Sequence, residues 1–443
     1  MLLESTDAAA ARAWLALSLD AVTDALSPPV ARALNIAFTS SGLLALGLDR
    51  DVLTQFPNEF VEGMATPFRQ RLLGDVGGSA PELWAWGGPH RPPVHLVLLL
   101  YAADRSALVA LQESESRRAA AHGLRTVATL DTVNLANREH FGFQDSISQP
   151  AIDGLSRPDR ALTTLATGEF VLGYPNAYGL LAERPLLAPS ADPLRILPPD
   201  SGGSGSVDLG RNGSYLVLRQ LRQRVHLFWR YVDQASRRPD GASDPARRTW
   251  VASKMVGRWP SGAPLVLAPD QDDPSLSGQN DFAYHAADPD GLRCPIGAHV
   301  RRANPRDSLD PRPGSSRSIE VANHHRILRR GREYGPPVDP ATLFEDVPDE
   351  EDRGLHFICL NANIARQFEF LQHTWLNSPK FAALHDEPDP LVAHHDGGAN
   401  FSIPAVPVRL RYRNVPDFVV VRGGEYFFMP GLRALRYLST LGS

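Results

Sequence analysis

Apolar and polar positions follow two different periods along this chain, and the two periods alternate. Four apolar runs have the length and composition of β-strands, at 33–40, 94–102, 213–221 and 354–362. Each run is followed by a segment whose apolar residues recur with helical spacing, at 41–48, 104–121, 224–235 and 364–376. Two further strands are predicted at 124–133 and 417–429. Each half of the chain therefore shows strand–helix followed by strand–helix.

This repetition predicts an α+β fold of two similar units, each an antiparallel sheet with helices on one face. Between the units, residues 184–213 are rich in Pro, Gly and Ser, and we expect them to form a long surface connection. The expected division is therefore an N-terminal domain at 1–183 and a C-terminal domain at 214–443. A length of 443 residues suits one large domain or two ordinary ones.

The composition is that of an ordinary globular protein, with 43% hydrophobic and 21% charged residues. A net charge of −5 argues against nucleic acid as the main partner. No apolar stretch approaches the roughly 18 residues of a membrane span. The N-terminus lacks a basic leader and a twin-arginine pair, which favours a cytoplasmic location. Cys294 and Cys359 are too few for a disulfide framework or a cysteine metal cluster, and a single bridge between them stays open.

The run CPIGAHVRRANPRD at 294–307 carries the first chemical signal. It places His299 in an apparent strand, followed by several arginines. A neutral imidazole is a good iron ligand, and guanidinium groups suit the carboxylates of a porphyrin. A satisfied structural histidine is the commoner role of such a residue, so the signal needs support from other segments.

Two further segments supply that support. In FGFQDSISQP at 141–150, Asp145 lies among apolar neighbours, where a carboxyl can take up and return a proton, although capping a turn is the alternative role. In HHRILRRGREYG at 324–335, a strand would turn one arginine inward, where it can stabilise developing negative charge. A solvated basic face is the alternative role, and it is expected for some of Arg326, Arg330 and Arg332.

Together with their flanks, these segments resemble the dye-decolourising peroxidase family, in its longer, C-terminally elaborated branch. The resemblance runs in order over most of the chain, from ALNIAFTSSGLLALGL through CPIGAHVRRANPRD and GLHFICLNANIARQFEF to VRGGEYFFMPGLRAL. It implies two ferredoxin-like units with antiparallel sheets and peripheral helices, arranged like a dimeric α+β barrel. It also implies a haem b peroxidase whose cofactor is held mainly by the C-terminal unit.

The resemblance implies a role for each matched residue. The family's GxxDG motif falls on 142–146, which makes Asp145 the acid–base residue, and the distal arginine falls on Arg329. The haem-ligating histidine, and hence the metal ligand, falls on His299. The apolar wall of the haem pocket falls on Leu355 and Phe357.

Other haem contacts are implied less directly. The proton on the far nitrogen of the ligating imidazole needs an acceptor, and the family supplies a carboxylate for it. Asp389 is the first choice for this carboxylate and Asp396 is the alternative. Candidates for the haem propionates follow the histidine, at Arg301, Asn304 and Arg306.

One departure from the family pattern concerns the turn beside Asp145. The last position of the GxxDG motif is Ser146 rather than glycine. If that position requires a positive φ, serine costs about 1 kcal/mol or more; if it requires only a small residue, serine is tolerated.

The implied partners are hydrogen peroxide and a small aromatic reductant such as a phenol or dye, and a homodimer is an open possibility. Asp145 would carry a proton between the peroxide oxygens, and Arg329 would stabilise negative charge as the O–O bond breaks. Bulky dyes cannot enter a small pocket. Tyr334 and Trp375 are therefore candidate oxidation sites at the surface, although core packing is the commoner role for either.

Two alternative functions remain at this stage. A haem-binding or haem-transfer protein with little turnover gains weight from Ser146. A non-haem metalloprotein would use residues of the histidine-rich segments, namely His324, His325, His394, His395 and Asp396. Adjacent histidines on an extended chain point in opposite directions, so each pair offers one ligand at most to a common site.

Overall fold

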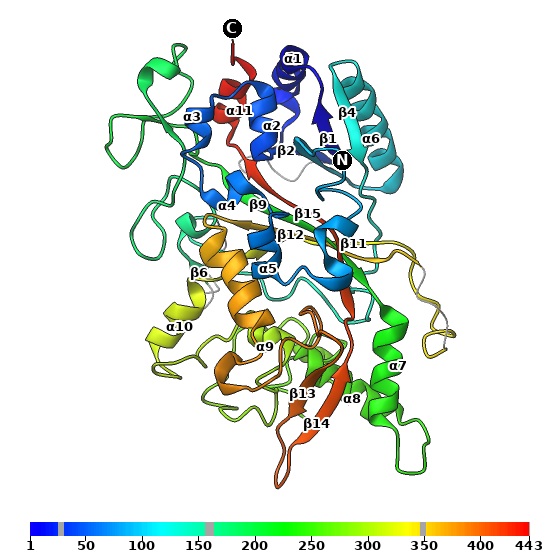
Figure 1. Ribbon diagram of the computed structural model, residues 1–443. Helices are drawn as coiled ribbons and strands as arrows, with labels where there is room; N and C mark the ends of the chain where they lie inside the picture. Colours follow the sequence, from blue (N-terminus) through cyan, green and yellow to red (C-terminus); the bar gives the residue numbers. More distant parts are fainter. Residues whose placement is uncertain (25–30, 156–163, 346–350, 443) are drawn as a thin grey trace.

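The computed structural model describes residues 1–24, 31–155, 164–345 and 351–442. Its central element is an antiparallel sheet of nine strands that runs through the middle of the molecule (Figure 1). The strand order is β10-β12-β9-β15-β2-β3-β1-β4, and β11 also pairs with β12. Within the described residues, no helix is both long enough and apolar enough to cross a membrane.

The first four strands and two helices form one ferredoxin-like unit. Their chain order is β1-α1-β2-β3-α6-β4, whereas their order in the sheet is β2-β3-β1-β4. The Asp7 and Asp104 side chains cap the two helices by accepting backbone N–H groups. The elements are β1 (Leu2–Ser5), α1 (Ala8–Ser18), β2 (Arg32–Phe38), β3 (Leu96–Ala102), α6 (Arg105–Ala120) and β4 (Leu124–Ala128).

The C-terminal half repeats this arrangement. Its strands lie in the order β10-β12-β9-β15, the same spatial order as in the first unit. The helix that follows β12 consists of two π-helical segments, η8 and η9. The elements are β9 (Ser214–Gln223), α7 (Val225–Ser236), β10 (Leu328–Arg329), β11 (Arg332–Tyr334), β12 (Gly354–Asn361), η8 (Ala365–Glu369), η9 (Leu371–Asn377) and β15 (Val419–Met429). The predicted α+β class with two ferredoxin-like units is confirmed.

The two units meet where β15 pairs with β2, at Phe428 and Phe38. A single apolar cluster crosses this junction and joins Trp14 of α1, Phe368 of η8 and Leu435 of α11 (Leu432–Ser439).

The strand β1 was not predicted, because LLES offers only two apolar residues and no alternation. Cys294 and Cys359 are both buried and unbridged.

The expected surface connection at 184–213 is more ordered than its composition indicates. Arg184 binds Asp200 and Asp208, and Leu209 is buried in the shared core. This segment also contains β7 (Leu186–Leu187) and β8 (Val207–Asp208), which pair with each other. The division of the chain at this segment stays a prediction.

Long connections around the second unit carry the chemistry. The segment between β4 and β9 includes Asp145, the segment between α7 and β10 includes His299, and the segment between η9 and β15 includes Asp389. The remaining α-helices and strands of the described residues are α2 (Ser40–Leu46), α3 (Arg50–Leu53), α4 (Asn58–Glu62), α5 (Pro67–Leu73), β5 (Ala151–Ile152), β6 (Thr164–Leu165), α8 (Pro245–Val256), α9 (His299–Ala303), α10 (Ser316–Asn323), β13 (Ala399–Ile403) and β14 (Leu410–Val415).

Candidate active site

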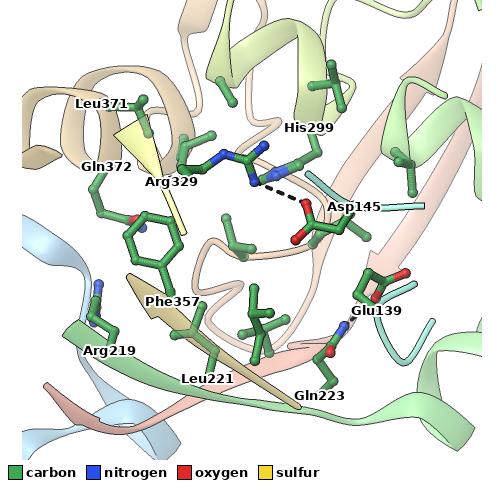
Figure 2. A pocket seen from close by; sticks show the side chains of 18 of the residues that line it. Glu139, Asp145, Arg219, Leu221, Gln223, His299, Arg329, Phe357, Leu371 and Gln372 are labelled. Carbon is green, nitrogen blue, oxygen red and sulfur yellow. Dashed lines mark hydrogen bonds and ion pairs between the residues drawn. The ribbon is translucent and has the colours of Figure 1, made fainter. Parts of the chain in front are cut away.

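A cavity of about 260 Å³ lies between the C-terminal sheet and the long connections. Its lining includes the matched residues His299, Asp145, Arg329, Leu355 and Phe357. Figure 2 shows the side chains of His299, Asp145 and Arg329 around one space, with Phe357 and Leu221 reaching up from the sheet. The structure therefore brings together five residues that come from four separate segments of the chain.

His299 begins helix α9 and does not lie in a strand, so the predicted local structure was wrong. Ala298 and Val300 flank His299 with the spacing of a strand. In the short helix that forms instead, Arg301 and Arg302 both reach buried partners. Arg301 binds Asp288, and Arg302 donates to the backbone carbonyl of Ser378 at 3.2 Å. These bonds fix the helix that presents the imidazole.

The His299 ring is oriented by Asp389. Its Nδ1 donates to Asp389 Oδ2 at 2.9 Å, and the Asp389 side chain is fully buried. Asp389 Oδ1 accepts the backbone N–H groups of Leu391 and Val392. Burial alone would raise the pKa of Asp389, but the interactions with His299 and these hydrogen bonds outweigh burial and hold the pKa below its ordinary value. Asp396, the alternative carboxylate, is exposed to solvent.

Asp145 and Arg329 form the second pair in the cavity. Arg329 Nη1 donates to Asp145 Oδ1 at 3.3 Å, and both side chains are partly exposed. Arg329 lies in β10, and its backbone N–H donates to the Gln149 side chain at 3.1 Å. Within the described part of 324–335, Arg330 and Arg332 are exposed as predicted for a basic face, whereas Arg326 is buried.

The turn that carries Asp145 is strained. Ser146 has a φ of 65° and Gly142 has a φ of 97°. The position of Ser146 therefore requires the left-handed conformation, which is the case in which serine costs energy relative to glycine. The Asp145 backbone N–H donates to the Asn137 carbonyl at 2.9 Å and helps to hold the turn closed.

A second carboxyl in the cavity was missed from the sequence. Glu139 accepts the backbone N–H groups of Phe141 and Phe143, both at 2.8 Å, and the side-chain amide of Gln223. Figure 2 shows it below Asp145. Burial raises the pKa of Glu139 to about 7, and the charge of Asp145 adds to the shift. The partners of Glu139 lie partly on a strand 84 residues away, and no local pattern reveals that contact.

The cavity also offers donors that suit an anionic group. Asn304 lines it, and its buried Nδ2 has no hydrogen-bond partner within the described residues. Arg326 lines it as well and is 6% exposed, with no ion pair to any described carboxylate. Burial lowers the pKa of Arg326 to about 9, with the charges of Arg306 and Arg329 contributing. The carboxylate groups of a porphyrin fit these donors.

The structure does not bring every predicted haem contact to the cavity. The guanidinium of Arg301 binds Asp288 and the Cys294 carbonyl, and it lies outside the lining. The guanidinium of Arg306 donates to the Asn280 and Phe282 carbonyls and also lies outside the lining. Both arginines therefore have structural partners of their own.

The histidines of the alternative metal site have separate partners. His324 bonds Tyr178, His325 stacks on Phe370, and His394 bonds Asp417. Across the described ranges, no three His, Cys, Asp or Glu side chains lie close enough to hold a metal ion together.

The two aromatic residues proposed as surface oxidation sites are buried. Tyr334 is 5% exposed and stacks on His356, and Trp375 is 4% exposed and packs against Phe370. Both residues therefore belong to the packed core of the protein.

Known proteins are similar to this chain over most of its length. Dye-decolorizing peroxidases of Exidia glandulosa and Mycena epipterygia are 32% and 34% identical to this chain over 422 and 440 residues, covering 91% of this chain and 75% of each relative. The multifunctional dye peroxidase DyP2 of an Amycolatopsis strain is 31% identical over 382 residues, covering 81% of this chain and 74% of the relative. No family model matches the chain.

Solved structures give the same result. The DyP-type peroxidase of Auricularia auricula-judae aligns with a TM-score of 0.78 and 26% identity, covering 99% of this chain and 94% of that one. An ancestral D-type dye-decolorizing peroxidase also aligns with a TM-score of 0.78, at 27% identity, covering 100% of this chain and 95% of that one. Because the fold is shared and these relatives are more than 30% identical, the chain belongs to the dye-decolourising peroxidase family and is a haem-dependent peroxidase.

Proposed function

We propose that this protein holds haem b in the cavity, reduces hydrogen peroxide and oxidises small aromatic molecules such as phenols and dyes in one-electron steps. One observation carries the proposal. A single cavity contains an imidazole oriented by a buried carboxylate and, beside it, an aspartate–arginine pair. The first arrangement suits iron binding, and the second suits proton transfer with charge stabilisation.

His299 is the proposed iron ligand. Because its Nδ1 donates to Asp389, the lone pair of Nε2 is free to bind a metal. Asn304 and Arg326 are proposed to bind the haem carboxylates, since both present unpaired donors to the cavity. Leu355 and Phe357 exclude water from its apolar side.

When bound, the haem supplies the electrons that cleave the peroxide bond and then accepts electrons one at a time from the reductant. Asp145 takes a proton from one peroxide oxygen and returns it to the other through its carboxylate. Arg329, held at 3.3 Å from that carboxylate, stabilises the negative charge on the departing oxygen.

The test is the absorption spectrum of haem-loaded protein before and after one equivalent of hydrogen peroxide, compared with His299→Ala and Asp145→Asn. We expect the Soret band to be lost in His299→Ala, and the peroxide-induced change to be delayed in Asp145→Asn. A Soret band that peroxide only bleaches would favour haem binding or transfer without turnover. Absence of any Soret band would contradict the proposal.

Two further expectations accompany this function. A cytoplasmic location and a homodimer both stay predictions. Size-exclusion chromatography with light scattering, and fractionation of the producing cells, test them directly.

A further inference from the structure

We propose that His394 and Asp417 form a second catalytic pair in the haem cavity, in which the imidazole takes the proton of a phenolic reductant as the phenol gives up its electron. Both side chains line the cavity. This inference rests on the proposed peroxidase function and assigns a residue to the reductant half of the reaction, whereas Asp145 and Arg329 serve the peroxide half.

The pair is built like the pair at His299. His394 Nδ1 donates to Asp417 Oδ2 at 3.0 Å, and the corresponding distance at His299 is 2.9 Å. Asp417 Oδ1 also accepts the backbone N–H of His395 at 2.7 Å, which holds the carboxylate in place. Because Nδ1 of His394 donates its proton to the carboxylate, Nε2 carries a lone pair. This Nε2 has no hydrogen-bond partner among the described residues.

A single imidazole with a free Nε2 suits a base better than a ligand of a non-haem metal. A protein site for such a metal takes three or more ligands, and none exists in the described parts of the chain. Imidazole takes up and releases a proton near neutral pH. The side chains of His394 and Asp417 are 23% and 26% exposed, so a molecule in the cavity can reach them.

The surroundings of the imidazole hold it in one position. A Cβ atom at Gly77, whose φ is 56°, would lie only 3.1 Å from His394 Cε1, so the ring fits against glycine there. The segment itself is anchored by His395, whose two ring nitrogens lie 2.9 Å and 2.8 Å from the carbonyl oxygens of Pro416 and Asp389. A base held in this way is oriented before the reductant binds.

The pair lies across the cavity from the groups proposed for peroxide. Arg329, which bonds Asp145, lies in β10, whereas Asp417 lies two positions before β15. In the order β10-β12-β9-β15, these strands are three spacings of about 4.8 Å apart. Arg326, proposed to bind a haem carboxylate, also lies beside β10. A reductant can therefore occupy the His394 side while peroxide reacts near Asp145.

Apolar side chains beside the pair provide a surface for an aromatic ring. Leu391 and Val392 come from the segment that carries His394, and Val419 begins β15 after Asp417. All three line the cavity. A phenol can rest its ring on these side chains and direct its hydroxyl to Nε2. This arrangement favours an uncharged phenol as the reductant.

The proposed step balances in atoms and electrons. As the phenol O–H bond breaks, its proton goes to Nε2 of His394, one electron goes to the haem, and a neutral phenoxyl radical leaves. Asp417 stabilises the imidazolium that forms. His394 then releases the proton to water before the next phenol binds. Two phenols supply the two electrons and two protons that convert one hydrogen peroxide into two waters.

Binding is tested first, on haem-loaded protein without peroxide. The probe is 4-nitrophenol, whose phenol and phenolate forms absorb at different wavelengths. The unaltered protein should shift the absorption of the probe toward the phenolate form in a saturable way, and His394→Gln should lose this shift. His373→Gln is the matched control, since His373 is exposed and lies outside the cavity lining. Equal shifts in the two variants, or no shift in the unaltered protein, would overturn the site.

The proton-accepting role is tested by comparing two reductants. Ferrocyanide gives up an electron without a proton, whereas phenol gives up both. His394→Gln should lower the ratio of kcat/KM for phenol to kcat/KM for ferrocyanide by about 10²-fold. Asp417→Asn should lower it less, because the ring keeps a hydrogen-bond acceptor but the imidazolium loses its counter-charge. An unchanged ratio in His394→Gln would overturn the role of His394.

The inference and the proposed function fail in different ways. If the unaltered protein oxidises neither ferrocyanide nor phenol with hydrogen peroxide, the proposed function fails. If ferrocyanide is oxidised and the ratio is insensitive to His394→Gln, only the catalytic pair fails. Loss of the Soret band in His394→Gln would make His394 a haem contact and would also overturn the pair.

Discussion

The two sides of the cavity differ in how firmly their chemical groups are held. On the His299 side, the imidazole is bound by a fully buried carboxylate that is itself held by two backbone N–H groups. On the Asp145 side, the aspartate and arginine are partly exposed, their contact is 3.3 Å long, and the turn behind them contains a strained serine. The groups proposed for cofactor binding are fixed, and the groups proposed for proton transfer can adjust.

This difference follows from what each side must do. A metal ligand works in one orientation, so every additional bond to its partner improves binding. A proton carrier has to reach two oxygen atoms in turn, so some freedom is useful. Substitutions on the two sides should therefore separate haem affinity from peroxide reactivity.

The largest effect is expected on the Asp145 side. Asp145→Asn should slow the reaction with hydrogen peroxide by about 10²–10⁴-fold, because the variant cannot transfer the proton. Its haem affinity should be unchanged. Stopped-flow absorbance measures the rate, and Asp153→Asn, an exposed carboxylate nearby in sequence, is the control. A comparable loss of haem affinity would show that the two sides are not separable.

The next effect is expected on the His299 side. Asp389→Asn should weaken haem binding by about 10–100-fold, since the acceptor that orients the imidazole loses its negative charge. Competition with apomyoglobin measures the affinity. Asp396→Asn, which alters an exposed carboxylate in the same segment, should have no effect. Equal affinity in both variants would remove Asp389 from the orienting role.

Glu139 should make stability depend on pH. A carboxyl with a higher pKa in the folded state stabilises folding at low pH, and this contribution is lost as pH rises from about 4.5 to about 7. The contribution of Glu139 to this loss should be about 3 kcal/mol, and the pH dependence of stability should be smaller by that amount in Glu139→Gln. Urea unfolding of the haem-free protein across this pH range measures it.

Glu425 provides the comparison for Glu139. Burial also raises its pKa to about 7, but it lies outside the cavity lining. Glu425→Gln should change the pH dependence of stability in the same way and leave the pH profile of peroxide reduction unchanged. If Glu139→Gln also leaves that profile unchanged, Glu139 only supports the turn.

The smallest effect is expected at Ser146. Ser146→Gly should relieve the strain at a φ of 65° and raise the free energy of unfolding by up to about 1 kcal/mol. Ser148→Gly, at a position without a positive φ, should instead destabilise the protein. Thermal unfolding of both variants measures this. A lower melting temperature for Ser146→Gly would show that the serine side chain contributes more than the strain costs.

Prediction from the sequence succeeded best where a single hydrophobic periodicity, or a single hydrogen-bonding requirement, determines the local structure. Alternation located the strands β2, β3, β9, β12 and β15. The family resemblance, together with the need for an acceptor on the imidazole, led to Asp389 as the first choice, and the structure shows its hydrogen bond to His299. Prediction was poorer where long-range contacts decide. The helix at His299 depends on anchors for Arg301 and Arg302, and the burial of Arg326 among its exposed neighbours depends on the cavity.

The pairing of β15 with β2 has a consequence for biosynthesis. The shared core draws on residues from Trp14 to Leu438, and the cavity lining extends from Leu73 to Val421. As the chain leaves the ribosome, the edge of β2 and the apolar faces around it stay uncovered until the last strand has emerged. Haem loading must therefore follow translation of nearly the whole chain, and a chaperone that shields β2 would improve the yield of loaded protein.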